Sequence, residues 1–143
     1  MDRVLPTTRS DYRHFCTIQT RWMDNDAYGH VNNATYYSFF DTAIALFLDS
    51  CDRQIGEKTA LVRVVVSSQC QYFAPVSFPN AVTVGIATAA LGRSSVRYAV
   101  AVFEGDCPTA AAQGEFVHVY VDQDTRRPME IPAQLRERLA ALR

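Results

Sequence analysis

Two carboxylates, Asp24 and Asp26, stand beside a glycine, a histidine and the asparagine pair Asn32-Asn33 within residues 21–36. An apolar run over residues 37–48 follows directly and is long enough to form a helix. These polar groups therefore precede a helix N-terminus, where backbone N–H groups lack intrahelical partners and carry partial positive charge. A carboxylate beside such amides could attack a carbonyl whose oxygen the amides hold. We expect the chemistry of this protein to start here.

The pattern D-x-D-x-x-G-H-V-N-N-x-x-Y, from Asp24 to Tyr36, resembles the signature of hotdog-fold acyl-CoA thioesterases of the 4-hydroxybenzoyl-CoA thioesterase type. Later segments resemble further parts of that family in the same order: Y-F-A-P-V at 72–76, L-G-R-S-S-V at 91–96, and G-E-F-V-H-V-Y-V-D at 114–122 followed by R-R-P at 126–128. The resemblance implies an α+β hotdog fold, in which one antiparallel sheet wraps around one long buried helix. It also implies a single domain over residues 1–143.

The same resemblance implies an acyl-CoA thioesterase, which hydrolyses a thioester to a free carboxylic acid and coenzyme A. Asp26 takes the position of the family's catalytic carboxylate, as a general base toward water or as a nucleophile that forms an acyl-enzyme anhydride. The structural alternative is that Asp26 only caps a turn, which Asp commonly does. Asp24 is expected to hold the loop, by accepting backbone N–H bonds or by pairing with Arg21.

The remaining motif residues have both functional and structural interpretations. Gly29 is expected to let the backbone turn sharply or approach a ligand closely. His30 could orient the substrate or donate to its carbonyl, or it could make a structural hydrogen bond. By the resemblance, the backbone N–H of Asn33 would polarise the thioester carbonyl, although Asn is also a favourable helix-capping residue. Tyr36 closes the motif and is assigned to substrate binding.

Arginines could hold the phosphates of coenzyme A, because a guanidinium fork matches phosphate oxygens. The candidates for this contact are Arg93, Ser94, Ser95, Arg126 and Arg127. The alternative is that these are ordinary surface residues of a hairpin and of the segment after the last strand. Coenzyme A is part of the substrate, and no metal or redox cofactor is expected, since the histidine spacing fits no metal site and no dinucleotide or P-loop motif occurs.

The bulk composition is that of an ordinary globular domain. The chain has 143 residues, is 48% hydrophobic and 20% charged, and carries a formal net charge of −1. This charge argues against a nucleic-acid partner, which would require many phosphates to be neutralised. We expect a cytoplasmic protein without a membrane partner, because no secretory signal and no bilayer-spanning run is recognisable. The widely spaced cysteines predict small, buried or half-buried hydrophobic residues: Cys16, Cys51, Cys70 and Cys107.

Hydrophobic periodicity predicts the elements that position these residues. Residues 14–21 alternate apolar and polar side chains, as in a strand. Residues 34–51 predict a helix that is apolar nearly all round and therefore buried on all sides. Runs of β-branched or alternating residues predict four more strands joined by short turns, hence an antiparallel sheet: 61–73, 81–90, 95–103 and 109–121. Pro132 predicts the start of a short terminal helix with Leu135, Leu139 and Leu142 on one stripe.

Several alternatives stay open at this point. An acyl-carrier-protein thioesterase would share the phosphopantetheine arm of the substrate but not the nucleotide. A non-catalytic acyl-binding hotdog domain would have no need of the Asp26 carboxylate, and the motif of a hotdog dehydratase is not visible. The resemblance also implies self-association as a dimer or tetramer, with active sites across the interface, and an apolar sheet needs cover for its edge. The acyl group depends on which aromatic side chains close the pocket, with Phe39, Phe40, Phe47, Tyr72 and Phe73 as candidates.

Overall fold

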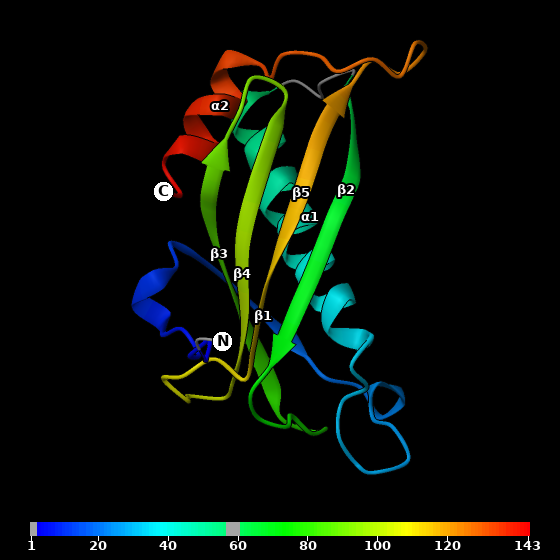
Figure 1. The fold of residues 1–143 in the computed structure, drawn as a ribbon, viewed down its shortest axis with the longest axis vertical. Helices are drawn as coiled ribbons and strands as arrows, with labels where there is room; N and C mark the ends of the chain where they lie inside the picture. Colours follow the sequence, from blue (N-terminus) through cyan, green and yellow to red (C-terminus); the bar gives the residue numbers. More distant parts are fainter. Residues whose placement is uncertain (1–2, 57–60) are drawn as a thin grey trace.

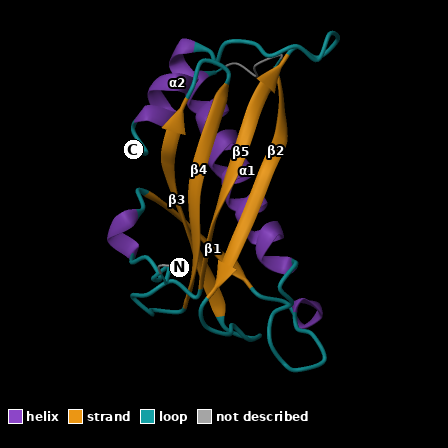
Figure 2. Cartoon of the chain, viewed as in Figure 1, coloured by secondary structure: helices purple, strands orange, loops and turns teal. Residues whose placement is uncertain are grey.

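One antiparallel sheet packs against one long helix in the computed structural model, which describes residues 3–56 and 61–143 (Figure 1). Figure 2 shows the long helix behind the strands and most loops gathered at the two ends of the sheet. The elements in chain order are β1 (His14–Gln19), α1 (Thr35–Ile55), β2 (Val62–Tyr72), β3 (Ala81–Leu91), β4 (Ser95–Glu104), β5 (Ala112–Val121) and α2 (Ala133–Ala140).

The strands lie in the spatial order β1-β3-β4-β5-β2, and every neighbouring pair is antiparallel. Short turns connect β3 to β4 and β4 to β5, whereas β2 follows α1 and pairs with β5 at the far edge. This arrangement confirms the predicted α+β hotdog fold. It also makes β2 an edge strand that begins near the C-terminal end of α1 and ends near its N-terminal end (Figure 1).

Most predicted boundaries differ from the observed ones by one to three residues. The largest difference is at α1, which continues four residues beyond position 51 to Ile55. It ends at Gly56, whose φ of 80° lies in the left-handed region that glycine adopts readily. β5 begins at Ala112 rather than at residue 109, because Thr109 instead forms an isolated bridge with Thr8 in the N-terminal segment.

The main core lies between α1 and the inner face of the sheet. Phe40 and Ile44 of α1 pack there against alternate residues of the strands, such as Val100, and all three side chains are buried. The predicted stripe of the terminal helix is confirmed, since these leucines are buried and belong to the same core: Leu135, Leu139 and Leu142.

Two predictions about burial are wrong for the single chain. α1 is not buried on all sides, because the sheet covers only one of its faces, and the other face exposes Asp41, Leu46 and Asp49. Cys107 is exposed rather than buried or half-buried, because it lies in the turn between β4 and β5. Within the described residues, no helix has both the length and the apolar character needed to cross a membrane.

His118 lies in the core on β5, with only 6% of its surface exposed. Its pKa is lowered, mainly by burial and further by the positive charge of Arg63, while Asp41 acts in the opposite direction. The unfolded chain therefore binds more protons than the folded chain once the pH falls below the ordinary pKa of 6.5. The resulting stability is fully present above that pH and is lost as the pH falls from there toward the folded-state pKa.

We expect the free energy of unfolding to fall with acidification below about pH 6.5, and to fall less steeply in the variant His118→Leu. Urea titrations at several pH values in chloride buffer measure the slope. Phe116→Leu is the matched control, because it also replaces a buried ring on β5 but removes no group that titrates, so it should leave the slope unchanged. An unchanged slope in His118→Leu would contradict the prediction.

Candidate active site

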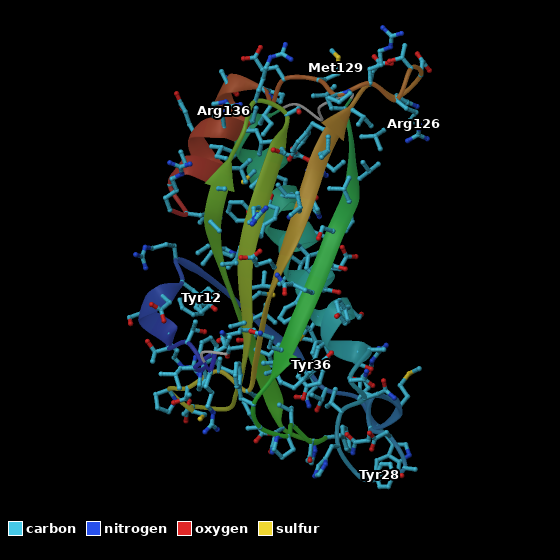
Figure 3. The ribbon with its side chains drawn as sticks, in the orientation of Figure 1. Tyr12, Tyr28, Tyr36, Arg126, Met129 and Arg136 are labelled. Carbon is cyan, nitrogen blue, oxygen red and sulfur yellow. The ribbon has the colours of Figure 1, made fainter. Side chains whose placement is uncertain are left out.

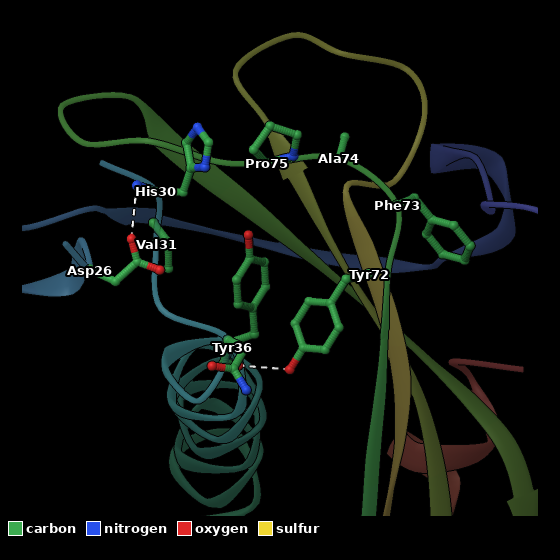
Figure 4. Close-up of a pocket in the computed structure, with 9 residues that line it drawn as sticks. Asp26, His30, Val31, Tyr36, Tyr72, Phe73, Ala74 and Pro75 are labelled. Carbon is green, nitrogen blue, oxygen red and sulfur yellow. Dashed lines mark hydrogen bonds between the residues drawn. The ribbon is translucent and has the colours of Figure 1, made fainter. Parts of the chain in front are cut away.

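A pocket of about 360 Å³ opens at the N-terminus of α1, between the loop that precedes the helix and the end of β2 (Figure 4). It brings together the motif residues with a segment some forty positions later in the chain. The residues that line it are Asp26, His30, Val31, Asn33, Tyr36, Tyr72, Phe73, Ala74 and Pro75.

Asp26 both closes a turn and presents a carboxylate oxygen to the pocket. Its Oδ1 accepts a hydrogen bond from the Tyr28 N–H at 2.8 Å and a longer one from the His30 N–H at 3.4 Å. The backbone closes the same turn, since the Asp26 N–H donates to the His30 carbonyl at 2.7 Å. Within the described residues no donor contacts Oδ2. Asp26 therefore caps the turn through Oδ1, and its Oδ2 is left to contact a bound substrate.

Asp24 holds the loop in both of the ways that the sequence predicts. Its side chain is buried, and Oδ2 accepts a hydrogen bond from the Arg21 N–H at 2.7 Å. Its Oδ1 lies 3.2 Å from the Arg21 guanidinium. The Asp24 carbonyl accepts from the Asn32 N–H at 2.8 Å, which ties the loop to the start of α1. These contacts occupy both carboxylate oxygens, so Asp24 has a structural role.

Gly29 is required for the shape of the loop rather than for close packing. Its φ of 83° is in the left-handed region, and an added Cβ would meet no atom within 4 Å. Of the two roles predicted for this glycine, the structure therefore supports the sharp turn. The turn places the exposed His30 side chain on the pocket rim, above Asp26 and beside Pro75 (Figure 4).

The turn that leads into α1 leaves one backbone amide without an acceptor in the described chain. Asn32 closes this turn, because its Oδ1 accepts from the Ala34 N–H and its carbonyl accepts from the Thr35 N–H, both at 2.9 Å. The Asn33 N–H donates to no acceptor among the described residues. Asp26 and Asn33 line the same pocket, so an acceptor bound there could contact this amide.

Tyr36 and Tyr72 form the wall of the pocket opposite the loop, with ring centroids 5.1 Å apart in an edge-on arrangement. Tyr36 is buried and its ring points up from α1 into the pocket (Figure 4). Burial raises its pKa to about 12, so its hydroxyl stays protonated. The Tyr72 hydroxyl donates to the Asn33 carbonyl at 2.7 Å, and burial raises its pKa as well.

Sequence reasoning does not identify the role of the Tyr72 hydroxyl, which holds the peptide that follows Asn33. The sequence predicts that the segment from Tyr72 to Pro75 ends a strand. Its signals are an aromatic pair shortly before a proline and the resemblance of residues 72–76 to the family, and neither predicts a contact with Asn33. Of the aromatic residues proposed to close the pocket, Tyr72 and Phe73 line it. The others are buried in the core behind it: Phe39, Phe40 and Phe47.

The proposed phosphate-binding residues do not join this pocket within one chain. Arg93, Ser94 and Ser95 lie at the hairpin between β3 and β4, where the Gly92 N–H donates to the Ser95 carbonyl at 2.8 Å. Arg126 and Arg127 follow β5 at the same end of the sheet. Figure 3 shows Arg126 and Tyr28 of the site loop at opposite ends of the molecule. These residues could reach a pocket only in another copy of the chain.

No group of three or more His, Cys, Asp or Glu side chains in residues 3–56 and 61–143 is arranged to bind a metal ion.

Comparisons with known proteins match the whole fold and most of the sequence. Residues 20–139 match the family described as the thioesterase-like superfamily. The crystal structure of the PA5185 protein from Pseudomonas aeruginosa strain PAO1 is 48% identical, with 96% of each chain covered and a TM-score of 0.90. A thioesterase from Thermus thermophilus, complexed with coenzyme A and Zn, is 31% identical, with 89% of this chain and 91% of that one covered and a TM-score of 0.70.

The YsmA protein of Bacillus subtilis (strain 168) is 25% identical over 96 residues, which are 67% of this chain. The match spans 65% of YsmA, slightly less than two thirds of that protein's length.

Proposed function

The chain belongs to the thioesterase-like superfamily, and we propose that it converts an acyl-CoA to a carboxylic acid and free coenzyme A. One observation carries the proposal. The Asp26 carboxylate, with Oδ2 unoccupied by any donor of the described chain, lines the same pocket as the unpartnered Asn33 N–H. Attack on a thioester carbonyl requires two groups. One is a carboxylate, which acts as the base or the nucleophile, and the other is an amide that donates to the carbonyl oxygen.

The Asn33 N–H would donate to the carbonyl oxygen, where negative charge develops as the tetrahedral intermediate forms. As a general base, Asp26 would take a proton from water while the water oxygen bonds to the carbonyl carbon. The C–S bond then breaks, and the proton passes to the leaving thiolate. As a nucleophile, Asp26 would itself bond to the carbonyl carbon and expel the thiolate, and water would then hydrolyse the anhydride. His30, at the rim, would orient the thioester or donate to its carbonyl.

We propose that the active assembly is a dimer or a larger oligomer. β2 is an edge strand with no neighbour on its outer side among the described strands, and it exposes Val65 and Val66. Beside it, α1 exposes Leu46. A second copy that paired antiparallel with this edge would lie end for end with the first. Its arginines would then lie at the end of the assembly where the first copy's pocket opens.

If these arginines bind the nucleotide, Arg93→Ala or Arg126→Ala should raise KM for an acyl-CoA and leave kcat nearly unchanged. The reason is that the lost contact stabilises the bound substrate and the transition state equally. Each charge-assisted contact would contribute on the order of 1–3 kcal/mol, or about a fivefold to 150-fold change in KM. The matched control is a short acyl-pantetheine thioester, which lacks the nucleotide and should show no change. Equal changes on both substrates, or none on either, would mean that these arginines do not contact the nucleotide.

The function is tested by measuring free thiol release from short, long and aromatic acyl-CoAs. We expect turnover of at least one class, and its abolition in an Asp26 variant. Turnover of acyl-carrier-protein thioesters without turnover of any acyl-CoA would favour the carrier-protein alternative. Saturable acyl-CoA binding without thiol release would instead identify a non-catalytic binding domain.

A further inference from the structure

One hydrogen bond joins the segment that leads into α1 to β2, at the edge of the sheet. The Tyr72 hydroxyl donates to the Asn33 carbonyl at 2.7 Å, although 39 positions of the chain separate the two residues. Tyr72 is the last residue of β2, and Figure 4 shows its ring pointing from β2 toward the start of α1. The bond therefore reaches the candidate site from an element other than the loop that carries Asp26.

The two peptide groups on either side of the Asn33 Cα are otherwise held by local bonds. The group before it is fixed through the Asn32 carbonyl, which accepts from the Thr35 N–H at 2.9 Å. In the group after it, the Ala34 N–H donates to Asn32 Oδ1 at 2.9 Å. The carbonyl of that second group is the one that Tyr72 holds. Among the described residues, the Asn33 N–H is the one polar group of these two peptides that has no partner.

Tyr72 is itself held firmly at the end of its strand. Its backbone is opposite the buried Ala112 of β5, and the next residue, Phe73, donates its N–H to the Ala111 carbonyl at 2.8 Å. Its ring lies edge-on to the ring of the buried Tyr36, at 5.1 Å between centroids. The hydroxyl is therefore presented by the sheet in a fixed place, as the support of a preorganised site requires.

We propose that Tyr72 is a positioning residue for thioester hydrolysis, whose hydroxyl holds Asn33 so that its N–H is aligned with the carbonyl oxygen of the substrate. The inference rests on the proposed function. A donor of this kind acts on the negative charge that develops in the transition state, and it is effective only if it is already aligned. A misplacement of about 1 Å can cost about a hundredfold in rate.

Tyr72 acts through Asn33 rather than on the substrate. Burial raises the pKa of its phenol, so the hydroxyl keeps its proton and remains a donor. A phenol has one proton to donate, and the Asn33 carbonyl already accepts it. Tyr72 therefore does not serve as the acid or base of the reaction, and the loss of its oxygen should change the rate without changing which groups titrate.

The first experiment is the steady-state kinetics of Tyr72→Phe, which removes the hydroxyl and keeps the ring against Tyr36. We expect kcat for an acyl-CoA to fall about tenfold to hundredfold, with KM within about threefold of the wild type and an unchanged shape of the pH profile. The physical reason is that the amide is misaligned where charge develops, whereas the contacts that bind the ground state remain.

Tyr12→Phe is the matched control. It also removes a hydrogen-bonded phenol oxygen, since the Tyr12 hydroxyl lies 2.8 Å from Thr7 Oγ1, but Tyr12 does not line the Asp26 pocket. Its kcat and KM should be those of the wild type. Rescue is tested by placing para-aminophenylalanine at position 72, because its amino group can still donate to the Asn33 carbonyl. We expect this variant to recover most of the lost kcat.

The second experiment measures the thioester carbonyl directly by infrared difference spectroscopy. The Asp26→Asn variant should hold an acyl-CoA with an isotope-labelled carbonyl without hydrolysing it. We expect binding to lower the carbonyl stretching frequency, because a hydrogen bond from the Asn33 N–H draws charge onto the oxygen. The lowering should be smaller when Tyr72→Phe is added to Asp26→Asn, and it should be unchanged when Tyr12→Phe is added instead.

The outcomes separate this inference from the proposed function. Normal kcat in Tyr72→Phe, in a preparation whose wild type is active and whose Asp26→Asn variant is not, would overturn the inference alone. A raised KM with unchanged kcat, a lost limb of the pH profile, or a para-aminophenylalanine variant as slow as Tyr72→Phe would also overturn it. A wild type that binds acyl-CoA without releasing thiol would refute the hydrolase, and the infrared comparison would still decide whether Tyr72 aligns the amide.

Discussion

Replacing Asp26 with asparagine is expected to lower turnover of an acyl-CoA at least about a hundredfold while leaving the fold intact. An amide is neither a base nor a nucleophile at neutral pH, so either mechanism would stop. The turn should survive, because the amide oxygen can still accept from the Tyr28 N–H as Oδ1 does. Steady-state kinetics give kcat, and circular dichroism with urea unfolding checks the fold. Near-normal turnover would remove Asp26 from the mechanism.

Asp24→Asn is the matched control, two positions away with the same chemical change. Its oxygens accept from the Arg21 N–H and pair with the Arg21 guanidinium in a buried position, so an amide there loses a charge-assisted bond. We expect mainly lower stability, by about 1–3 kcal/mol, with a much smaller loss of turnover than in Asp26→Asn. A larger loss of turnover at Asp24 than at Asp26 would reverse the assignment.

Phe40→Ala is expected to lower the free energy of unfolding by about 3–5 kcal/mol, because it removes a buried ring and leaves a cavity. Phe40 is 0% exposed on the inner face of α1, and its ring lies 6.0 Å from that of Phe116 on β5. The variant therefore loosens the contact between the helix and the sheet that positions the Asn33 amide. Urea denaturation at fixed protein concentration measures the change.

Tyr28→Ala serves as the control for that loss, since it also replaces an aromatic ring with alanine. Tyr28 is 88% exposed, and its backbone N–H, which contacts Asp26, is kept. We expect a change in stability within about 0.5 kcal/mol. Comparable losses in the two variants would mean that the packing of Phe40 does not dominate the stability of the helix.

The sequence alone predicts the elements well, because their signals are local. Alternation at positions 14–21 corresponds to β1, and the apolar run after the motif corresponds to α1. The predicted C-terminal end of α1 lies four residues early, because the charged residues Asp52 and Arg53 lie on its partly exposed side and mask the helical pattern. The true stop is the left-handed Gly56, which is itself a local signal.

The residues of the candidate site fall into two groups, those that a local pattern predicts and those that only the fold brings to the site. Asp26, Gly29 and Asn33 lie within one short segment, where the turn and the helix start bring them to one place, so their types and spacing predict a common site. Tyr72 contacts Asn33 only because β2 runs back along α1, and no local pattern contains that information. The arginines show the opposite case, since a family motif suggests a shared ligand, whereas the sheet places Arg126 at the end of the molecule opposite the site loop.

Residue types and their spacing are therefore enough to indicate which groups could do chemistry and which segments are strand or helix, since both follow from contacts between near neighbours in the chain. The strand order, which leaves β2 at an edge and one face of α1 exposed, is visible only in the folded molecule. The same holds for the contact between the buried rings of Tyr98 and His118, which belong to different strands. Contacts between distant segments depend on which strands pair, and strand pairing is set by the packing of the whole core rather than by any single stretch of residues.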